Sequence, residues 1–359
     1  MASLKNRIIL DCDLMNHPHS GLYYYCLNLG MQVQALLENS RSESISFYVP
    51  PAEAKSFGPE ARVIVERKRW WDFMRRTPFQ CNVWHAPFQS GRIIPDRKKY
   101  PATRVLLTIH DLNPLHEGKP ADEQARSLAH TQSLIDRADA IVCISNFCRE
   151  DVLRNCDTGN KPLYVIHNGT HYVHPAALNG VSYRPTRPFL FGMGYVNRKK
   201  NFHVLLPLLQ DEKIELLVAG RLDEPDYITA MKETAEKMNV ADRLHLLGPV
   251  SEGEKAWYYS NCLAFVHPSL AEGFGAPVTE VMQFGKPIFL SALTSLPEIA
   301  GDAAFYFPNF EPASMQRVFY QGLETHAKEQ MCDKVRQWGM QFDWKEKAKQ
   351  YLEVYRSLY

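Results

Sequence analysis

Residues 263–280 read LAFVHPSLAEGFGAPVTE, and this stretch is the most informative about the fold. The apolar run at 263–267 predicts a buried strand, and the glycines at 273 and 275 predict a tight loop after it. Pro277 suits the first turn of a helix. A strand, a glycine-rich loop and a helix in succession present free N–H groups at the start of the helix, which is a natural seat for a diphosphate.

Outward from this stretch, strand-like runs alternate with helical patterns along the whole chain. Runs such as 105–109 are apolar without alternation, as expected of parallel strands that are covered on both faces. Two series of such runs predict an α/β protein made of two Rossmann-like, doubly wound domains. The predicted strands are 7–11, 45–49, 82–85, 104–110, 140–144 and 163–166, followed by 189–192, 214–220, 244–246, 263–267, 287–290 and 304–307.

The domain boundaries follow from a segment with little periodicity. Residues 171–188 contain three prolines and one glycine, which is typical of a linker. We therefore expect an N-terminal domain at 1–175 and a C-terminal domain at 186–340. From Trp344 to Leu358 the apolar residues recur on one helical face, so residues 341–359 are expected to form an amphipathic helix. It either closes the second domain or crosses back to the first, and we favour the crossing.

Composition excludes several classes of protein. The 359 residues carry 41 basic and 40 acidic side chains, so the net charge of +1 gives no general basis for binding nucleic acid. The eight cysteines form no CxxC pair and no zinc-site spacing, as is typical of reduced thiols. No window is apolar enough to cross a bilayer, and residues 1–6 lead directly into a strand. We therefore expect a cytoplasmic location.

Two carboxylates flank the glycine loop. Glu272 precedes it, and Glu280 lies in the helix that follows. Each is expected to accept hydrogen bonds from sugar hydroxyls on one side of a diphosphate. The alternative for Glu280 is an ordinary side chain near the positive end of a helix dipole.

A second glycine turn carries three cations. The sequence Gly192-Met-Gly194 is followed by Arg198, Lys199 and Lys200, which open a helical segment. Cations at a helix start are unfavourable unless an anion offsets them, and a diphosphate would do so. The alternative is a solvated basic turn.

Other polar residues follow the strands of the first domain, where ligands bind in open α/β sheets. Asp11 and Asp13 form a D-x-D triplet of the kind that holds a divalent metal in some nucleotide-sugar enzymes, but residues ending a strand explain them better, and we expect no metal. The candidate acceptor or loop residues are Gly21, Asp111, Ser145 and Asn168, with His110 beside Asp111.

With these residues assembled, the chain resembles the retaining glycosyltransferases of the GT-B fold, specifically glycosyltransferase family 4. The resemblance rests on the E-x7-E pattern from Glu272 to Glu280, on residues 285–287 and 295–304, and on the ending at 342–355. It implies two domains that face a central cleft, with the last helix crossing back to the first domain.

The resemblance also implies roles for single residues. Glu272 would bind hydroxyls of the donor sugar, Glu280 the ribose, and His110 the transferred sugar near the reacting carbon. Amides of Gly273, Phe274 and Gly275 would hold phosphate oxygens. Lys200 would neutralise the diphosphate with Arg198 or Lys199 in support, without a metal or other cofactor.

Two positions depart from the family pattern. Tyr23 stands where many members have the second glycine of the first loop, and Tyr195 stands where many have arginine. Which of Arg198, Lys199 and Lys200 is the main phosphate ligand is therefore left open.

One stretch is locally basic. Between Lys55 and Arg104 the chain has twelve basic and four acidic residues. At 67–76, cations alternate with aromatic side chains, a mixture that suits an anionic membrane surface. The alternatives are a packed helix with solvated charges or a groove for acceptor phosphate. The candidate membrane residues are Arg67, Lys68, Arg69, Trp70, Trp71, Arg75 and Arg76.

The resulting expectation is a retaining, metal-independent transfer of a sugar from a nucleotide-diphosphate sugar to a saccharide or lipid-linked saccharide, on the inner face of the cytoplasmic membrane. Residues 192–206 favour mannose from GDP-mannose by their similarity to surface-polysaccharide mannosyltransferases. The alternatives are another GT-B enzyme, such as a nucleotide-sugar epimerase, and a two-lobed sugar-binding protein without catalysis.

Overall fold

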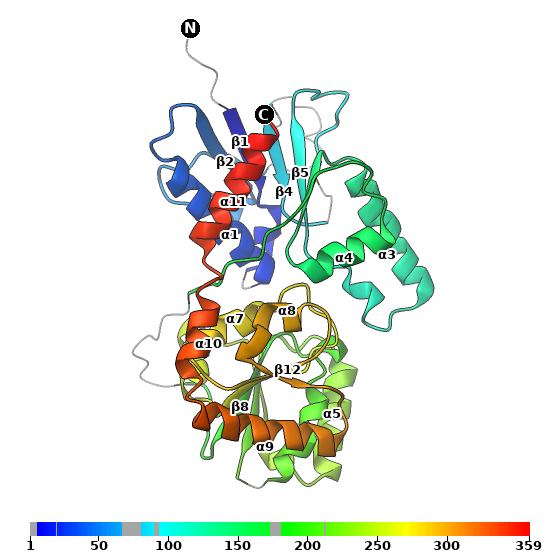
Figure 1. Ribbon diagram of the computed structural model, residues 1–359, viewed down its shortest axis with the longest axis vertical. Helices are drawn as coiled ribbons and strands as arrows, with labels where there is room; N and C mark the ends of the chain where they lie inside the picture. Colours follow the sequence, from blue (N-terminus) through cyan, green and yellow to red (C-terminus); the bar gives the residue numbers. More distant parts are fainter. Residues whose placement is uncertain (1–5, 19, 67–79, 90–92, 173–180, 212) are drawn as a thin grey trace. The chain divides into compact units, whose positions relative to one another are not determined.

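The computed structural model describes residues 6–18, 20–66, 80–89, 93–172, 181–211 and 213–359 (Figure 1). They form two compact units. Unit 1 comprises the chain up to His171 together with Phe342–Tyr359, and unit 2 comprises Tyr172–Gln341. Each is an α/β unit built on one parallel sheet, as the alternation of strands and helices predicts.

Unit 1 has a seven-stranded sheet in the order β3-β2-β1-β4-β5-β6-β7. The chain moves outward from β1 in one direction and returns beside it at β4, so the strand order reverses between these two strands. The strands are β1 (Asn6–Asp11), β2 (Glu43–Val49), β3 (Val63–Val65), β4 (Val83–Ala86), β5 (Arg104–Ile109), β6 (Ala140–Cys143) and β7 (Leu163–Val165). The helices are α1 (Gly21–Leu37), α3 (Ala121–Ile135), α4 (Asn146–Asn155) and α11 (Trp344–Ser357), with 3-10 turns η1 (Asp13–Asn16), η2 (Pro51–Glu53) and η3 (Asn113–Leu115).

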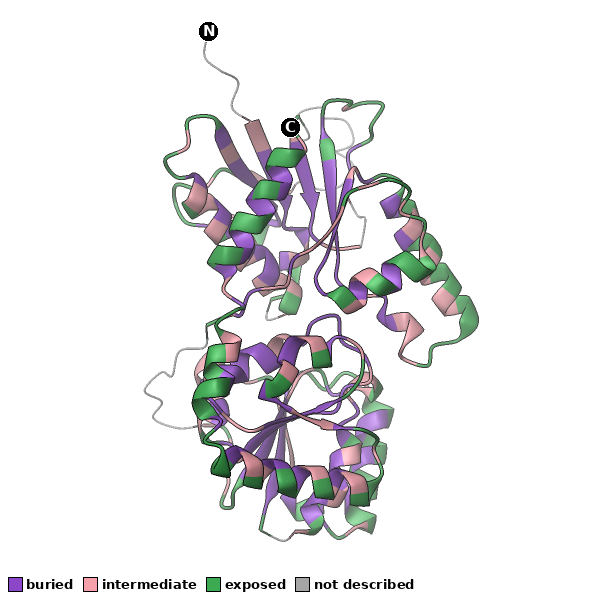
Figure 2. Cartoon of the chain, viewed as in Figure 1, coloured by how far each residue is buried: buried purple, intermediate pink, exposed green. Residues whose placement is uncertain are grey.

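The sheet of unit 1 is covered on both faces. Ile8, Ile9 and Leu10 are consecutive in β1 and none has exposed surface, which is why the strand is apolar without alternation. Figure 2 shows buried strands between helices that keep one exposed face.

Helix α11 belongs to unit 1 and packs beside α1 (Figure 1). Its tyrosines, Tyr351 and Tyr355, are buried, and the hydroxyl of each has a hydrogen-bond partner. The Tyr25 hydroxyl donates to the Tyr351 hydroxyl at 2.7 Å, and the Tyr355 hydroxyl lies 2.8 Å from His85 Nδ1. His85 Nε2 lies 2.7 Å from the Thr108 hydroxyl. This buried polar network ties α11 to α1, β4 and β5.

Unit 2 has a six-stranded sheet in the order β10-β9-β8-β11-β12-β13, and its strand order reverses between β8 and β11. The strands are β8 (Phe189–Met193), β9 (Glu215–Ala219), β10 (Leu244–Gly248), β11 (Ala264–His267), β12 (Ile288–Ser291) and β13 (Phe305–Phe307). The helices are α5 (Pro225–Lys237), α6 (Glu252–Asn261), α7 (Ala276–Met282), α8 (Leu296–Ala300), α9 (Pro312–Lys328) and α10 (Cys332–Gly339), with 3-10 segments η4 (Arg198–Lys200), η5 (Phe202–Gln210), η6 (Ala241–Arg243) and η7 (Gly301–Ala303).

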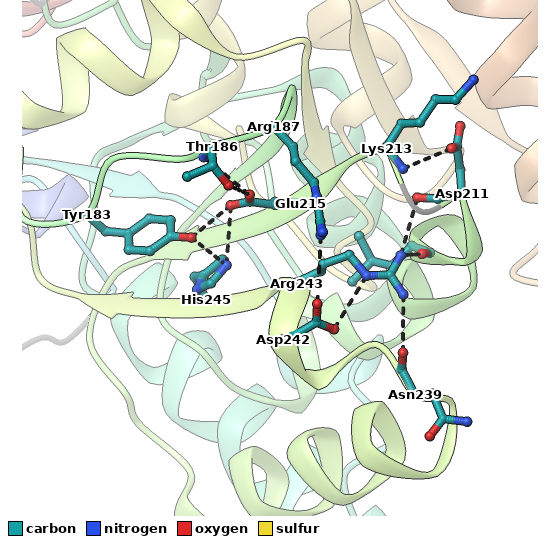
Figure 3. A network of polar contacts seen from close by, with 11 residues as sticks. Tyr183, Thr186, Arg187, Asp211, Lys213, Glu215, Asn239, Asp242, Arg243 and His245 are labelled. Atoms are coloured by element: carbon teal, nitrogen blue, oxygen red, sulfur yellow. Dashed lines mark hydrogen bonds and ion pairs between the residues drawn. The ribbon is translucent and has the colours of Figure 1, made fainter.

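A network of polar side chains lies at the amino ends of β9 and β10 (Figure 3). Glu215 is buried and accepts hydrogen bonds from the Tyr183 hydroxyl (2.9 Å) and the Thr186 hydroxyl (3.1 Å). His245 stacks on the Tyr183 ring with centroids 4.1 Å apart. Ligands of such sheets bind at the carboxyl ends of the strands, so this network at the opposite end serves the fold.

The cysteines and the helices agree with an ordinary α/β protein. All eight cysteines are free thiols, and Cys332 is the exposed one. Across the described ranges, no helix has both the length and the apolarity needed to span a bilayer.

Candidate active site

Two loops meet at the point in unit 2 where the strand order reverses, one after β8 and one after β11. Asn201 ends η4 with a left-handed φ of 59°, and its side-chain amide donates to the Pro268 carbonyl at 3.2 Å. The Leu270 N–H donates to the Lys199 carbonyl at 2.8 Å. These bonds hold the cationic turn against the glycine loop, at the place where α/β sheets bind ligands.

A cation, a carboxylate and an imidazole converge in this place. Glu272 Oε1 accepts hydrogen bonds from the Lys200 ammonium and from His267 Nε2, the latter at 2.8 Å. The side chains of Lys200 and Glu272 are 12% and 11% exposed, so the pair is shielded yet reachable. His267, which ends β11, is fully buried.

The charge states follow from these contacts. Burial opposes ionisation of Glu272, but the Lys200 ammonium and the His267 hydrogen bond hold its pKa well below the usual value. Burial and the nearby Lys200 charge lower the pKa of His267. The imidazole is therefore neutral, and it donates through Nε2 because that nitrogen faces a carboxylate oxygen, while the buried Nδ1 has no hydrogen-bond partner among the described residues.

The glycine loop presents unpaired backbone amides. Gly275 has a φ of 86° and is the N-cap of α7, and a Cβ at this position would lie 2.8 Å from Leu296 Cδ2. Among the described residues, the buried N–H groups of Gly273 and Gly275 meet no hydrogen-bond acceptor. Buried amides need an acceptor, and phosphate oxygens supply one.

Glu280, in α7, is 7% exposed and tied to α6. Its carboxylate accepts a hydrogen bond from the Tyr259 hydroxyl at 2.9 Å and lies 3.3 Å from the Lys255 ammonium. Lys255 also pairs with Glu252 at 2.9 Å. Glu280 is thus held by a buried cation and is not an ordinary surface side chain.

Three residues of this site were not predicted from the sequence: Lys255, Tyr259 and His267. Lys255 and Tyr259 are four residues apart, which places them on the same buried face of α6. A lysine on an otherwise apolar helix face was the available signal. His267 had the weaker signal of a polar residue that ends an apolar strand.

Three other residues were predicted to bind the donor: Arg198, Lys199 and Phe274. The Arg198 side chain is 69% exposed and pairs with Glu224 at 3.6 Å. Lys199 contributes its carbonyl to the loop contact described above, and Phe274 is buried. Lys200 is therefore the cation placed closest to Glu272.

The departure at Tyr195 has a structural counterpart. Arg221, which follows β9, places its guanidinium 4.4 Å from the centroid of the Tyr195 ring. The arginine that many family members have at position 195 is absent here, but the guanidinium of Arg221, from the loop after β9, lies against the Tyr195 ring.

In unit 1, His110 directly follows β5 and is 6% exposed. Its Nε2 lies 2.8 Å from the Pro87 carbonyl, and its ring meets the Tyr25 ring edge-on at 4.8 Å. Burial lowers the pKa of His110 to about 4. A neutral ring that donates through Nε2 keeps Nδ1 as a hydrogen-bond acceptor.

Of the remaining candidate residues of unit 1, Asp111 and Ser145 form hydrogen bonds with backbone N–H groups. Asp111 Oδ1 accepts from the Asn113 N–H at 3.1 Å and shapes the loop after β5. Ser145 is fully buried and caps α4 by accepting from the Cys148 N–H at 3.1 Å. Gly21 opens α1 and has room for an added Cβ. Asn168 Oδ1 is buried and has no hydrogen-bond partner in the part of the chain that the structure describes.

Two further predictions concern metal and membrane. Within the described ranges, no three His, Cys, Asp or Glu side chains are grouped so that they could hold a metal ion. Asp11 Oδ1 accepts from the Asp13 N–H at 3.2 Å at the end of β1. The membrane stretch at 67–76 lies outside the described residues and stays a prediction.

Comparison with known families matches both halves of the chain. The family model described as Glycosyltransferase Family 4 matches residues 29–172, and the model described as Glycosyl transferases group 1 matches residues 181–336. O-antigen chain mannosyltransferase B of Escherichia coli is 23% identical, over 98% of this chain and 100% of the relative.

Solved structures match over the same extent. Sucrose-phosphate synthase from Thermosynechococcus elongatus superposes with a TM-score of 0.76 at 19% identity, covering 99% of both chains. HepE from Anabaena, solved in complex with UDP and glucose, gives a TM-score of 0.72 at 15% identity and covers 98% of this chain and 100% of its own. These likenesses show the two-domain GT-B fold.

Proposed function

Since the chain belongs to glycosyltransferase family 4, we propose that it transfers mannose from GDP-mannose to a saccharide acceptor, free or lipid-linked, in the synthesis of a surface glycan. Mannose is supported by the mannosyltransferase of Escherichia coli, whose full length this chain matches. The proposed reaction retains the anomeric configuration and needs no metal.

The observation that carries the proposal is the set of groups at the reversal point of unit 2. The Lys200 ammonium, the Glu272 carboxylate and the unpaired amides of Gly273 and Gly275 lie on two loops that are hydrogen-bonded to each other. A diphosphate accepts from the amides and is neutralised by the lysine, while the carboxylate accepts from sugar hydroxyls.

The surroundings of Glu280 support guanine as the base. If Glu280 binds the ribose, the base lies near the side chains that contact Glu280. One of these is Lys255, which pairs with both Glu280 and Glu252. The Glu252 side chain, at the start of α6, is 44% exposed and so can reach the base. A carboxylate accepts hydrogen bonds, and the Watson–Crick edge of guanine offers two adjacent donors, N1–H and the N2 amino group.

The chemistry follows from the same groups. The bond between the anomeric carbon and the phosphate oxygen breaks, and the acceptor oxygen bonds to that carbon on the same face. The acceptor proton passes to the departing phosphate, so no separate protein base is required. Lys200 stabilises the charge that develops on the leaving diphosphate, and His110 accepts a hydrogen bond from the transferred sugar.

Nucleotide binding tests the donor site. In a thermal-shift panel of UDP, GDP and ADP without metal, we expect GDP alone to stabilise the protein by several degrees. Glu280→Gln is expected to abolish the shift, and Glu252→Gln to reduce the preference for GDP over UDP. The matched control is Glu233→Gln, at an exposed position of α5. Equal shifts with all three nucleotides would contradict the guanine assignment, and no shift would contradict the donor site.

Product analysis tests the reaction. With GDP-mannose and a set of mannosides as acceptors, release of GDP should depend on the acceptor and persist in EDTA. NMR of the product should show an α-linkage, which is the configuration of the donor. A β-linked product or full inhibition by EDTA would contradict the proposed mechanism.

A further inference from the structure

A histidine–aspartate pair lies in unit 1 outside the candidate residues of the active site. His116 ends the short turn η3 after β5, and Asp151 lies in the second turn of α4. His116 Nε2 is 2.5 Å from Asp151 Oδ2. The Asp151 side chain is 5% exposed, whereas the His116 side chain is 29% exposed. The pair thus has a buried carboxylate and an imidazole that reaches the surface.

The backbone of this loop is held by local hydrogen bonds in addition to the pair. The His116 N–H donates to the Asn113 carbonyl at 2.8 Å, and the Asn113 N–H donates to Asp111 Oδ1 at 3.1 Å. The Leu115 N–H donates to the Leu112 carbonyl at 3.0 Å. The carboxylate joins the loop to α4, and it also sets the orientation of the His116 ring.

The orientation leaves one ring nitrogen open to a ligand. With Nε2 turned to Asp151, Nδ1 of His116 has no hydrogen-bond partner among the described residues. The Phe147 ring lies beside the imidazole, with centroids 5.2 Å apart. A polar nitrogen next to a half-buried aromatic ring suits a sugar, which offers hydroxyls on its edge and C–H groups on its face.

The position favours a substrate. His116 and Phe147 follow β5 and β6 at the carboxyl edge of the sheet, the same edge that carries His110. Ligands of doubly wound sheets bind beyond this edge. His110 is assigned to the transferred sugar, and His116 lies six residues further along the chain, so we assign the sugar at His116 and Phe147 to the acceptor.

We propose that His116, oriented by Asp151, binds a hydroxyl group of the saccharide acceptor. A hydroxyl both donates and accepts, so Nδ1 engages it whether the imidazole is neutral or protonated. Asp151 acts through His116 and is a positioning residue. The assignment rests on the proposed glycosyltransferase function and names where its acceptor is held.

The test measures binding of simple glycosides to the full chain in the presence of saturating GDP. The probes are methyl α-glycosides of mannose, glucose, galactose and N-acetylglucosamine, followed by ligand-observed NMR. His116→Gln keeps a donor at the Nε2 position toward Asp151 but removes Nδ1. Asp151→Asn removes the charge that orients the ring. His130→Gln, at an exposed position of α3, is the matched control.

We expect at least one glycoside to bind the parent and the control equally, and about tenfold more weakly to His116→Gln, which corresponds to ~1.4 kcal/mol. Binding of GDP should be unchanged in every variant, so failure of the donor site would be recognised separately. Equal binding of glycoside to parent and His116→Gln, or no glycoside binding to the parent, would overturn the assignment.

A measurement on the parent guards against a variant that fails to fold. In protein labelled with 15N-histidine, addition of the bound glycoside should shift the Nδ1 resonance of His116. It should leave that of His130 in place. An unchanged His116 resonance at saturating glycoside would also overturn the proposal.

Discussion

At the scale of single residues, the candidate donor site is a set of buried charges that stabilise one another. Glu272 and Glu280 are both nearly buried, and each lies beside a lysine, Lys200 and Lys255 respectively. A buried carboxylate without a cation is strongly unfavourable. The two lysines therefore preserve the charges that are proposed to bind sugar hydroxyls, in addition to any direct contact with the donor.

Substitution of Lys200 should separate it from its neighbours in the turn. We expect Lys200→Met to lower kcat/KM about 100- to 1000-fold, because it removes both the phosphate cation and the partner of Glu272. Arg198→Met changes an exposed side chain of the same turn and should cost less than tenfold. Steady-state kinetics with GDP-mannose measures both. A larger loss in Arg198→Met would make the arginine the main phosphate ligand.

The sequence predicted the residues that lie in one loop and missed those that packing brings to it. Glu272, Gly273, Gly275 and Glu280 are recognisable because their spacing is local, and a glycine loop before a helix is a common seat for a phosphate. His267, Lys255 and Tyr259 reach the same carboxylates from β11 and α6. Their contacts depend on how the helix packs on the sheet, which spacing along the chain does not express.

At the scale of elements, α11 shows how far a periodic pattern reaches. Six residues were predicted to share an apolar face: Trp344, Ala348, Tyr351, Leu352, Tyr355 and Leu358. The first five are buried, and Leu358 is partly buried against the same core. The pattern alone left open which domain the helix joins. The choice is made by tyrosine hydroxyls that meet His85 and Tyr25, and by Arg356, which binds Glu43 at 2.7 Å.

Short edge elements were harder to predict. Strand β3 (Val63–Val65) was missed because two half-exposed residues and one exposed residue beside charged neighbours carry little periodicity. It forms because β2 offers it an open edge. The long apolar strands, by contrast, were predicted to within two residues at each end.

The packing of α11 against unit 1 can be tested at Gly169. A Cβ there would lie 2.3 Å from Trp344 Cγ, so Gly169→Ala must displace the first turn of α11. We expect a loss of about 1–3 kcal/mol in the free energy of unfolding. Gly21→Ala is the control, because α1 begins there and, apart from the adjoining residues and the helix backbone, no described atom lies within 4 Å of the added methyl. Urea unfolding measures both, and equal midpoints would show that α11 is not held at this point.

At the scale of the whole molecule, stability should depend on pH through buried neutral histidines. Burial, together with the nearby His110, lowers the pKa of His85 to about 3, and burial lowers the pKa of His110 to about 4. In the unfolded chain both titrate near 6.5. The unfolded state therefore binds more protons below pH 6.5, so the stabilisation is complete above this pH and is lost as the pH falls toward 3–4.

The window from pH 7.5 to 5.5 isolates this effect. The chain carries 41 basic and 40 acidic side chains, so net repulsion is small near neutrality, and carboxylates titrate mainly below this window. Each of the two histidines should cost ~1.4 kcal/mol across it. Urea unfolding of the parent at both pH values should show at least this combined loss. His85→Gln, which can still bond Tyr355 or Thr108, should lose ~1.4 kcal/mol less between the two pH values. An identical loss in parent and variant would mean that His85 takes up a proton in the folded protein as readily as in the unfolded chain, so that the buried network that joins α11 to β4 becomes charged near pH 5.5.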